Sequence, residues 1–253
     1  MTSTGTPFSN VGRNLRQIGS SPVSWAWVAV ILGIQALVMA VGGPDRQPAW
    51  GWFQMLGLSR EGFFSGKIWQ VFSYGFLHGS GWHAGVNALF VLLIGSRIEH
   101  VAARAAMSKA VIFGVIGGGI GHLVLAPGGS GAPLLVGLSG GCLGLLLLLT
   151  TLSPQSRMMP LPVSGRSLGL GILSAELMLA LIDPGLGLPG FSKLGEIFVR
   201  HGLGAWFQIG HACHFGGGLA GWIFGRWLLR PRITLGRLRR DRERREARES
   251  RRM

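Results

Sequence analysis

The chain has 253 residues and a formal net charge of +14; 48% of its residues are hydrophobic and only 13% are charged. A soluble globular domain usually carries about 25% charged residues, so this composition excludes an ordinary soluble protein. The 43 glycines are typical of transmembrane helices whose backbones pack in close contact. We therefore expect an all-α, polytopic membrane protein.

Six apolar windows predict six transmembrane helices, because about 17–25 residues span the hydrocarbon core of a bilayer. The windows lie near residues 24–42, 82–98, 110–126, 134–153, 167–183 and 206–229, and the third and fifth are short. Prolines lie between them, where helix breakers belong. The first window could instead be a signal peptide, but it is longer than the usual apolar region of about 7–15 residues.

The positive charge is concentrated in an arginine-rich tail. Residues 230–253 hold 11 arginines against 4 acidic residues and few apolar ones, a pattern that favours a tail at an anionic membrane surface over an arm that binds RNA. With six spans both termini lie on one side, and the tail places that side in the cytoplasm. We expect a segment at 1–22, a six-helix membrane domain at 23–229, a cytoplasmic tail at 230–253, and no nucleic-acid partner.

Polar residues gather at the external ends of the second, fourth and sixth windows. They are His78, His83 and Asn87 in the second window, Ser139 in the fourth, and His211 and His214 in the sixth. Polar groups at membrane depth are costly unless they are paired or face a wet cavity. Three helices that offer such groups at matching depth predict one shared cavity.

The residue types in this cavity are those of nucleophilic catalysis. Ser139, about one turn into its predicted helix, is the candidate nucleophile, and His214 or His211 is the candidate base. His83 and Asn87 share one helical face and can donate hydrogen bonds to an oxyanion, together with the Ser139 N–H. The alternatives are that Gly-x-Ser-Gly is only a small-residue packing face and that His83 and Asn87 only join helices.

No carboxylate is expected beside these groups. Glu99 lies at the cytoplasmic end of the second window, and Glu176 lies on another helix, so we expect a Ser–His dyad. Gly217 and Gly221 have the Gly-x-x-x-Gly spacing of closely packed helices, and a close fourth and sixth helix would bring His214 to Ser139. No His-Glu-x-x-His motif is present, and we expect neither a metal nor an organic cofactor.

Five motifs in this order resemble the rhomboid family of intramembrane serine proteases, over roughly Ile68 to Trp227. They are Trp69 before the second helix, His83-x-x-x-Asn87, Gly95-Ser-Arg-Ile-Glu99, Gly137-Leu-Ser139-Gly140 and His214-x-x-Gly217-x-x-x-Gly221. The resemblance implies a six-helix fold with the serine below the membrane surface in a water-filled cavity. It also implies that His214 is the base, and that the substrates are transmembrane helices that unwind locally.

The resemblance further implies a bacterial-type enzyme. Because the sequence shows no organelle transit peptide and is of modest size, we expect the inner membrane as its location. Two positions depart from the family pattern: Gln70 replaces the arginine usual after the tryptophan, and Leu143 stands where an aromatic residue commonly stacks on the histidine. These departures leave two alternatives open. One is an inactive rhomboid-fold protein that binds transmembrane clients, and the other is a rhombosortase-like processing protease.

Overall fold

The protein forms an all-α bundle in the computed structural model, which describes residues 15–129, 133–158, 162–231, 236, 238–240 and 242–244. Most of the predicted N-terminal segment and of the arginine-rich tail lie outside these residues. The long helices are α2 (Pro22–Ala40), α6 (Gly81–Phe90) continued by η2 (Val91–Gly95) and α7 (Ser96–Val101), α8 (Arg104–Leu125), α9 (Ser139–Leu152), α10 (Gly165–Leu181) and α12 (His211–Leu228). Each of them coincides with one of the six apolar windows.

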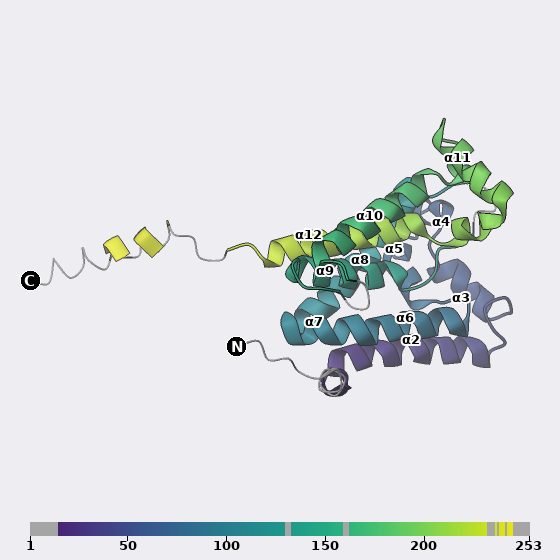
Figure 1. Cartoon of the computed structure of the whole chain (residues 1–253). Coiled ribbons are helices and arrows are strands. Elements are labelled where there is room, and N and C mark those ends of the chain that lie inside the picture. The colour runs from purple at the N-terminus through teal and green to yellow at the C-terminus, as the bar shows by residue number, and fades with distance from the viewer. Residues whose placement is uncertain are drawn as a thin grey trace, which may run out of the picture.

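Shorter helices fill the two long connections of the described chain. Between α2 and α6 lie α3 (Ala49–Leu56), α4 (Arg60–Phe64), α5 (Gln70–Ser73) and η1 (Tyr74–Phe76). Between α10 and α12 lie η3 (Pro184–Leu186), α11 (Phe191–Phe198), η4 (Val199–Leu203) and η5 (Gly204–Gln208). In Figure 1, α3 and α4 lie toward one end of the bundle, and α11 extends from that same end.

Two of the predicted boundaries were wrong. The fourth window starts at residue 134, yet α9 begins only at Ser139, because Leu135 pairs through its backbone with Leu58 and Gly137 has a φ of 115°. Ser139 is therefore the first residue of its helix rather than a residue one turn inside it. The third window looked short, but α8 has 22 residues.

The lengths of the helices determine how far each one extends through a bilayer. Among the described residues, three helices are long and apolar enough to cross a membrane: α2, the continuous α6–α7 helix, and α8. The apolar helix α9 has only 14 residues, which at 1.5 Å per residue spans about 21 Å. Because the hydrocarbon core is about 30 Å thick, at least one end of α9 lies below the membrane surface when the bundle sits in a bilayer.

Glycines let α8, α9 and α12 touch backbone to backbone. A Cβ at Gly144 would lie 2.9 Å from the Gly114 Cα, and one at Gly217 would lie 2.7 Å from the Gly140 Cα. A Cβ at Gly221 would lie 2.6 Å from the Gly144 Cα. None of these positions has room for a side chain, so these three helices form the tightest part of the bundle.

The helices α2 and α6 lie side by side, as Figure 1 shows, and Glu99 joins this pair at one end. Its carboxylate accepts hydrogen bonds from the Ser24 N–H at 2.6 Å, the Ser24 hydroxyl at 2.7 Å and the Val23 N–H at 3.4 Å. Two of these donors are backbone groups in the first turn of α2, which have no acceptor within their own helix. Glu99 thus caps α2 from a neighbouring helix.

Candidate active site

Ser139 lies at the N-terminal end of α9, on a turn held by backbone contacts. The Gly137 N–H donates to the Tyr74 carbonyl at 3.0 Å, and the Leu138 N–H donates to His78 Nε2 at 3.3 Å. Burial lowers the pKa of His78 to about 4, and the neighbouring His83 also lowers it. His78 is therefore neutral and can accept this bond, which leaves Ser139 half-buried on a fixed turn.

The His83 imidazole packs directly over Gly137. A Cβ at Gly137 would lie 2.5 Å from His83 Cε1 and 2.7 Å from Nε2. The positive φ of Gly137 also disfavours any other residue there. His83 is partly buried, and its ring meets the His78 ring edge-on, with 5.0 Å between centroids. The imidazole thus reaches the α9 N-terminus from α6.

Asn87, one turn further along α6, presents an unused donor. Its side chain is 4% exposed, and Oδ1 accepts a weak hydrogen bond from the Cys142 thiol at 3.5 Å. Within the described residues, Nδ2 is buried and has no hydrogen-bond partner. An unsatisfied buried donor costs about 1–3 kcal/mol, so a native protein that keeps one calls for an explanation.

His214 approaches the same place from α12. The glycine contacts pair Gly217 with Gly140 and Gly221 with Gly144, so α9 and α12 run parallel with a constant offset. Extended one turn toward the N-termini, this register brings the His214 backbone opposite the turn that precedes Gly140. His83 packs over Gly137, the residue that this register sets opposite His214. The structure therefore gathers His83, Asn87 and His214 around the N-terminal end of α9.

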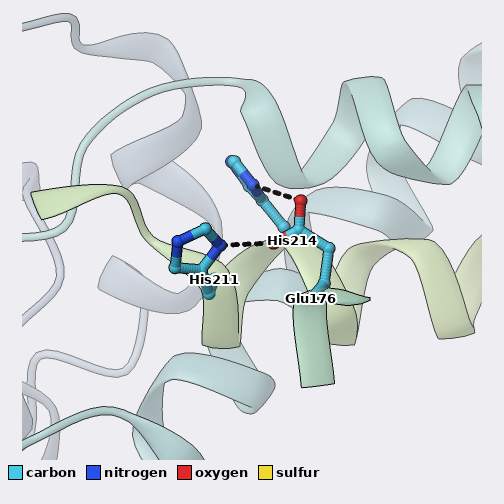
Figure 2. A group of neighbouring side chains, drawn as sticks. All are labelled: Glu176, His211 and His214. Carbon is cyan, nitrogen blue, oxygen red and sulfur yellow. Dashed lines mark hydrogen bonds and ion pairs between the residues drawn. The ribbon is translucent and has the colours of Figure 1, made fainter. Parts of the chain in front are cut away.

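A carboxylate does lie beside the histidines, contrary to the expectation from the sequence. Glu176 on α10 contacts both of them (Figure 2): Oε1 is 3.2 Å from His214 Nδ1, and Oε2 is 2.6 Å from His211 Nδ1. His211 Nε2 lies 2.9 Å from the Trp206 carbonyl oxygen. The three side chains are 7–18% exposed, so the cluster is largely sheltered from solvent.

The same three residues are the group that could hold a metal ion in the described chain. Glu176, His211 and His214 each offer one ligand atom, all within 4.8 Å of one another. A tetrahedral zinc ion would hold two such ligand atoms about 3.3 Å apart, given bonds of about 2.0 Å. The 2.6 Å between Glu176 and His211 is instead the length of a direct, charge-assisted hydrogen bond.

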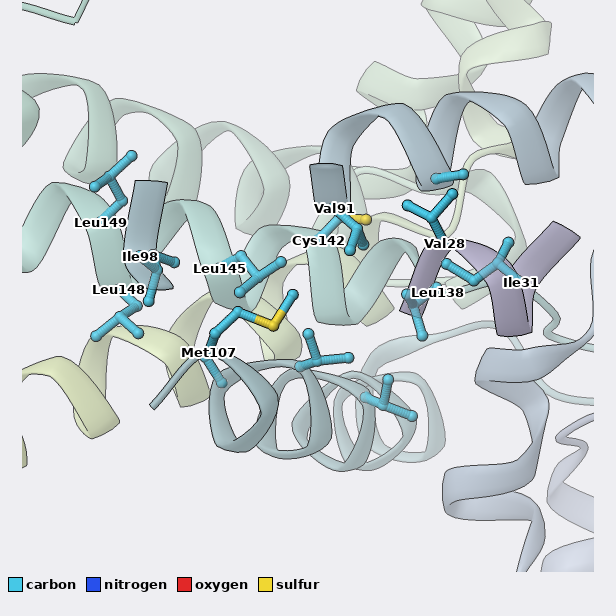
Figure 3. Packing of buried hydrophobic residues seen from close by; sticks show 14 of the residues in the cluster. Val28, Ile31, Val91, Ile98, Met107, Leu138, Cys142, Leu145, Leu148 and Leu149 are labelled. Atoms are coloured by element: carbon cyan, nitrogen blue, oxygen red, sulfur yellow. The ribbon is translucent and has the colours of Figure 1, made fainter. Parts of the chain in front are cut away.

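The helix that carries Ser139 is anchored in the apolar core, as Figure 3 shows. Leu138, Leu145 and Leu148 are fully buried, and they belong to one cluster with Val91 and Met107 from neighbouring helices. Burying a leucine side chain contributes about 1.5–3 kcal/mol. This packing holds α9 against its neighbours, while Ser139 at its N-terminal end is half-buried.

The first loop is held by Trp69 and Gln70. The Trp69 indole N–H donates to the Met55 carbonyl at 3.0 Å, and the Gln70 amide donates to the Gln54 and Met55 carbonyls at 3.3 Å each. Gln70 is 1% exposed, and its Oε1 accepts the Ser59 N–H at 3.4 Å. The residue that departs from the family pattern thus joins α5 to the end of α3 and the start of α4 within the first loop.

The rhomboid domain family matches residues 65–231, a range that contains every site residue described above. The chain belongs to the rhomboid family. Among curated proteins, none matches it. Membership makes this an integral membrane protein of a family that consists mostly of intramembrane serine proteases and also contains inactive forms.

The sequence predicts no role for two residues of this candidate site. It groups His78 with the polar residues of the second window, and it places Glu176 on another helix, away from the site. One feature of the sequence could have indicated the role of Glu176: it is an acidic residue in the middle of the apolar segment 167–183. An ionisable residue at membrane depth requires a partner.

Proposed function

We propose that this rhomboid is an intramembrane serine endopeptidase that cleaves transmembrane segments of other membrane proteins. The observation that carries the proposal is the parallel glycine contact of α9 and α12, which sets Ser139 and His214 at adjoining N-terminal ends. Family membership adds support, because most rhomboids have this activity. The proposed location is the cytoplasmic membrane of a bacterium, with both termini in the cytoplasm.

In the proposed reaction, Ser139 Oγ attacks the scissile carbonyl carbon while His214 Nε2 accepts the serine proton. The developing oxyanion takes hydrogen bonds from the unpaired Asn87 amide, from His83 and from the Ser139 N–H. His214 then donates its proton to the amine as the C–N bond breaks. Water attacks the acyl-enzyme next, and its proton passes through His214 back to Ser139. None of these steps uses a metal or a cofactor.

The short α9 supports a reaction below the membrane surface. An intact substrate helix cannot react there, because its carbonyls are hydrogen-bonded and shielded within the helix. We therefore infer that the substrate unwinds locally at the cleavage site. Ser139 is half-buried and the His214 side chain is 15% exposed, so neither group is completely sealed from water.

The test is cleavage of a transmembrane reporter in lipid vesicles, with labelling by a fluorophosphonate probe. Wild type should cleave and label, whereas Ser139→Ala and His214→Ala should each abolish cleavage and remain folded. Ser153→Ala, at the other end of α9, is the matched control and should behave as wild type. Folded wild type that neither labels nor cleaves would contradict the proposal and favour a protein that only binds transmembrane clients.

A further inference from the structure

The Glu176 carboxylate lies where it can set the protonation pattern of His214. The helix α10 packs on α9 at Gly169, where a Cβ would lie 2.7 Å from Thr150 Oγ1. Glu176 is seven residues further along, about 10 Å toward the Ser139 end of α9. Its two oxygens then divide between two imidazoles of α12, one oxygen for each ring (Figure 2).

The hydrogen-bond chain fixes where each proton is. The Trp206 carbonyl can only accept, so His211 Nε2 carries a hydrogen. The 2.6 Å contact between His211 Nδ1 and Glu176 Oε2 holds one further proton. Whichever of these two atoms bears that proton, Glu176 Oε1 remains an acceptor. His214 Nδ1, 3.2 Å away, must therefore donate to it.

This pattern leaves His214 Nε2 with a free lone pair. A general base that accepts a serine proton through Nε2 needs this tautomer, with a carboxylate on Nδ1–H to hold the ring and to stabilise the imidazolium that forms. The chain lacks an aromatic residue at Leu143 that could stack on the ring. The ring is instead fixed by a hydrogen bond from a third helix.

We propose that Glu176 is the positioning residue for His214, which extends the dyad to a Ser139–His214–Glu176 triad in which His211 anchors the carboxylate. This inference rests on the proposed function, because the serine and the base are those of the proposed protease. His211 acts only through Glu176: its bond to Oε2 and its bond to Trp206 hold the flexible glutamate in one conformation.

Two substitutions separate the hydrogen bond from the charge. In Glu176→Gln, the amide N–H can donate to His211 Nδ1 and the amide oxygen can still accept from His214, so the tautomer is kept and only the charge is lost. We expect kcat to fall about tenfold, because a charge-assisted hydrogen bond is roughly twice as strong as a neutral one. Glu176→Met keeps the length of the side chain but removes both the hydrogen bonds and the charge, and kcat should fall about 10²- to 10⁴-fold.

Both variants should leave KM within about threefold of wild type, because Glu176 does not touch the substrate. The matched control is Glu196→Gln on α11, an exposed glutamate, which should change nothing. The double variant Glu176→Met/His211→Leu removes both partners of the buried pair and restores an apolar contact. A merely structural role predicts that this double variant regains activity; the positioning role predicts that it stays as slow as Glu176→Met.

A second measurement does not depend on activity. Nitrogen-15 NMR of histidine-labelled protein, with His214 assigned through His214→Ala, reports which ring nitrogen is protonated. Wild type and Glu176→Gln should show His214 with Nδ1–H and bare Nε2, and Glu176→Met should lose this preference. If wild type shows the preference but never cleaves, the proposed protease fails and the positioning contact stands. Unchanged His214 resonances in Glu176→Met, or kcat within threefold of wild type, would overturn the inference.

Discussion

The backbone contact between α9 and α12 makes a sharp prediction for Gly217→Ala. The added Cβ would lie 2.7 Å from the Cα and carbonyl carbon of Gly140 and closer still to the carbonyl oxygen. Ordinary carbon contacts begin near 3.5 Å, and neither backbone can turn aside as a side chain would. The two helices must therefore separate by roughly 1 Å, and His214, one turn away on α12, moves with its helix.

A displacement of about 1 Å between reacting groups can cost about 10²-fold in rate. We expect Gly217→Ala to lower kcat by about that factor in the vesicle cleavage assay. Overpacking should also lower the free energy of unfolding by about 1–3 kcal/mol, measured by thermal unfolding in detergent. The loss of rate should persist at temperatures where the variant is fully folded.

Gly171→Ala on α10 is the matched control, because nothing lies within 4 Å of the Cβ it would add. This variant makes the same chemical change within an apolar helix and should keep wild-type activity. It should even gain a little stability, since alanine has the higher helix propensity. Wild-type activity in Gly217→Ala would refute the reasoning, because it would mean that the contact does not set the distance between Ser139 and His214.

Two further predictions concern single hydrogen-bonding groups. Asn87→Ala removes the unpaired amide donor, and kcat should fall about 10²- to 10³-fold with little change in KM in the vesicle cleavage assay. An unchanged kcat would remove Asn87 from the proposed oxyanion site. Glu99→Gln weakens the cap of α2, so the free energy of unfolding should fall by about 1–3 kcal/mol while cleavage per folded molecule is kept. A thermal midpoint equal to wild type would show that the cap is not needed.

Much of the fold was predictable because apolar windows and glycine spacing are local signals. Each predicted window coincides with a long helix, and the spacing of Gly217 and Gly221 corresponds to a real backbone contact with α9. The start of α9 was mispredicted because Leu134 and Leu135 are as apolar as the helix that follows. This segment is not helical, because Leu135 pairs through its backbone with Leu58. Hydropathy alone does not distinguish such an apolar extended segment from a helical turn.

The contact of Glu176 with the histidines was not predictable from the same signals. Periodicity tells which residues share a face of one helix, but it does not give the rotation of α10 relative to α12. Glu176 is 35 and 38 residues from its two partners, and no motif spans that interval. The positions of Ser139 and His214 are different, because Ser139 directly precedes Gly140 and His214 lies three residues before Gly217, and these two glycines belong to the pattern that specifies the packing partner.

The residues of the candidate site are therefore held in two ways, by backbone packing and by side-chain hydrogen bonds. Ser139 and His214 are set by glycine contacts in which backbone meets backbone, an arrangement with almost no freedom because close-packed helices resist sub-ångström shifts. The carboxylate reaches the site through side-chain hydrogen bonds, while its helix α10 is packed against α9 at the far end, around Gly169 and Thr150. It follows that the proposed nucleophile and the proposed base are positioned by the fold itself. The tautomer that we propose for His214 depends instead on the two hydrogen bonds of Glu176, which a single substitution can remove without altering the helix contacts.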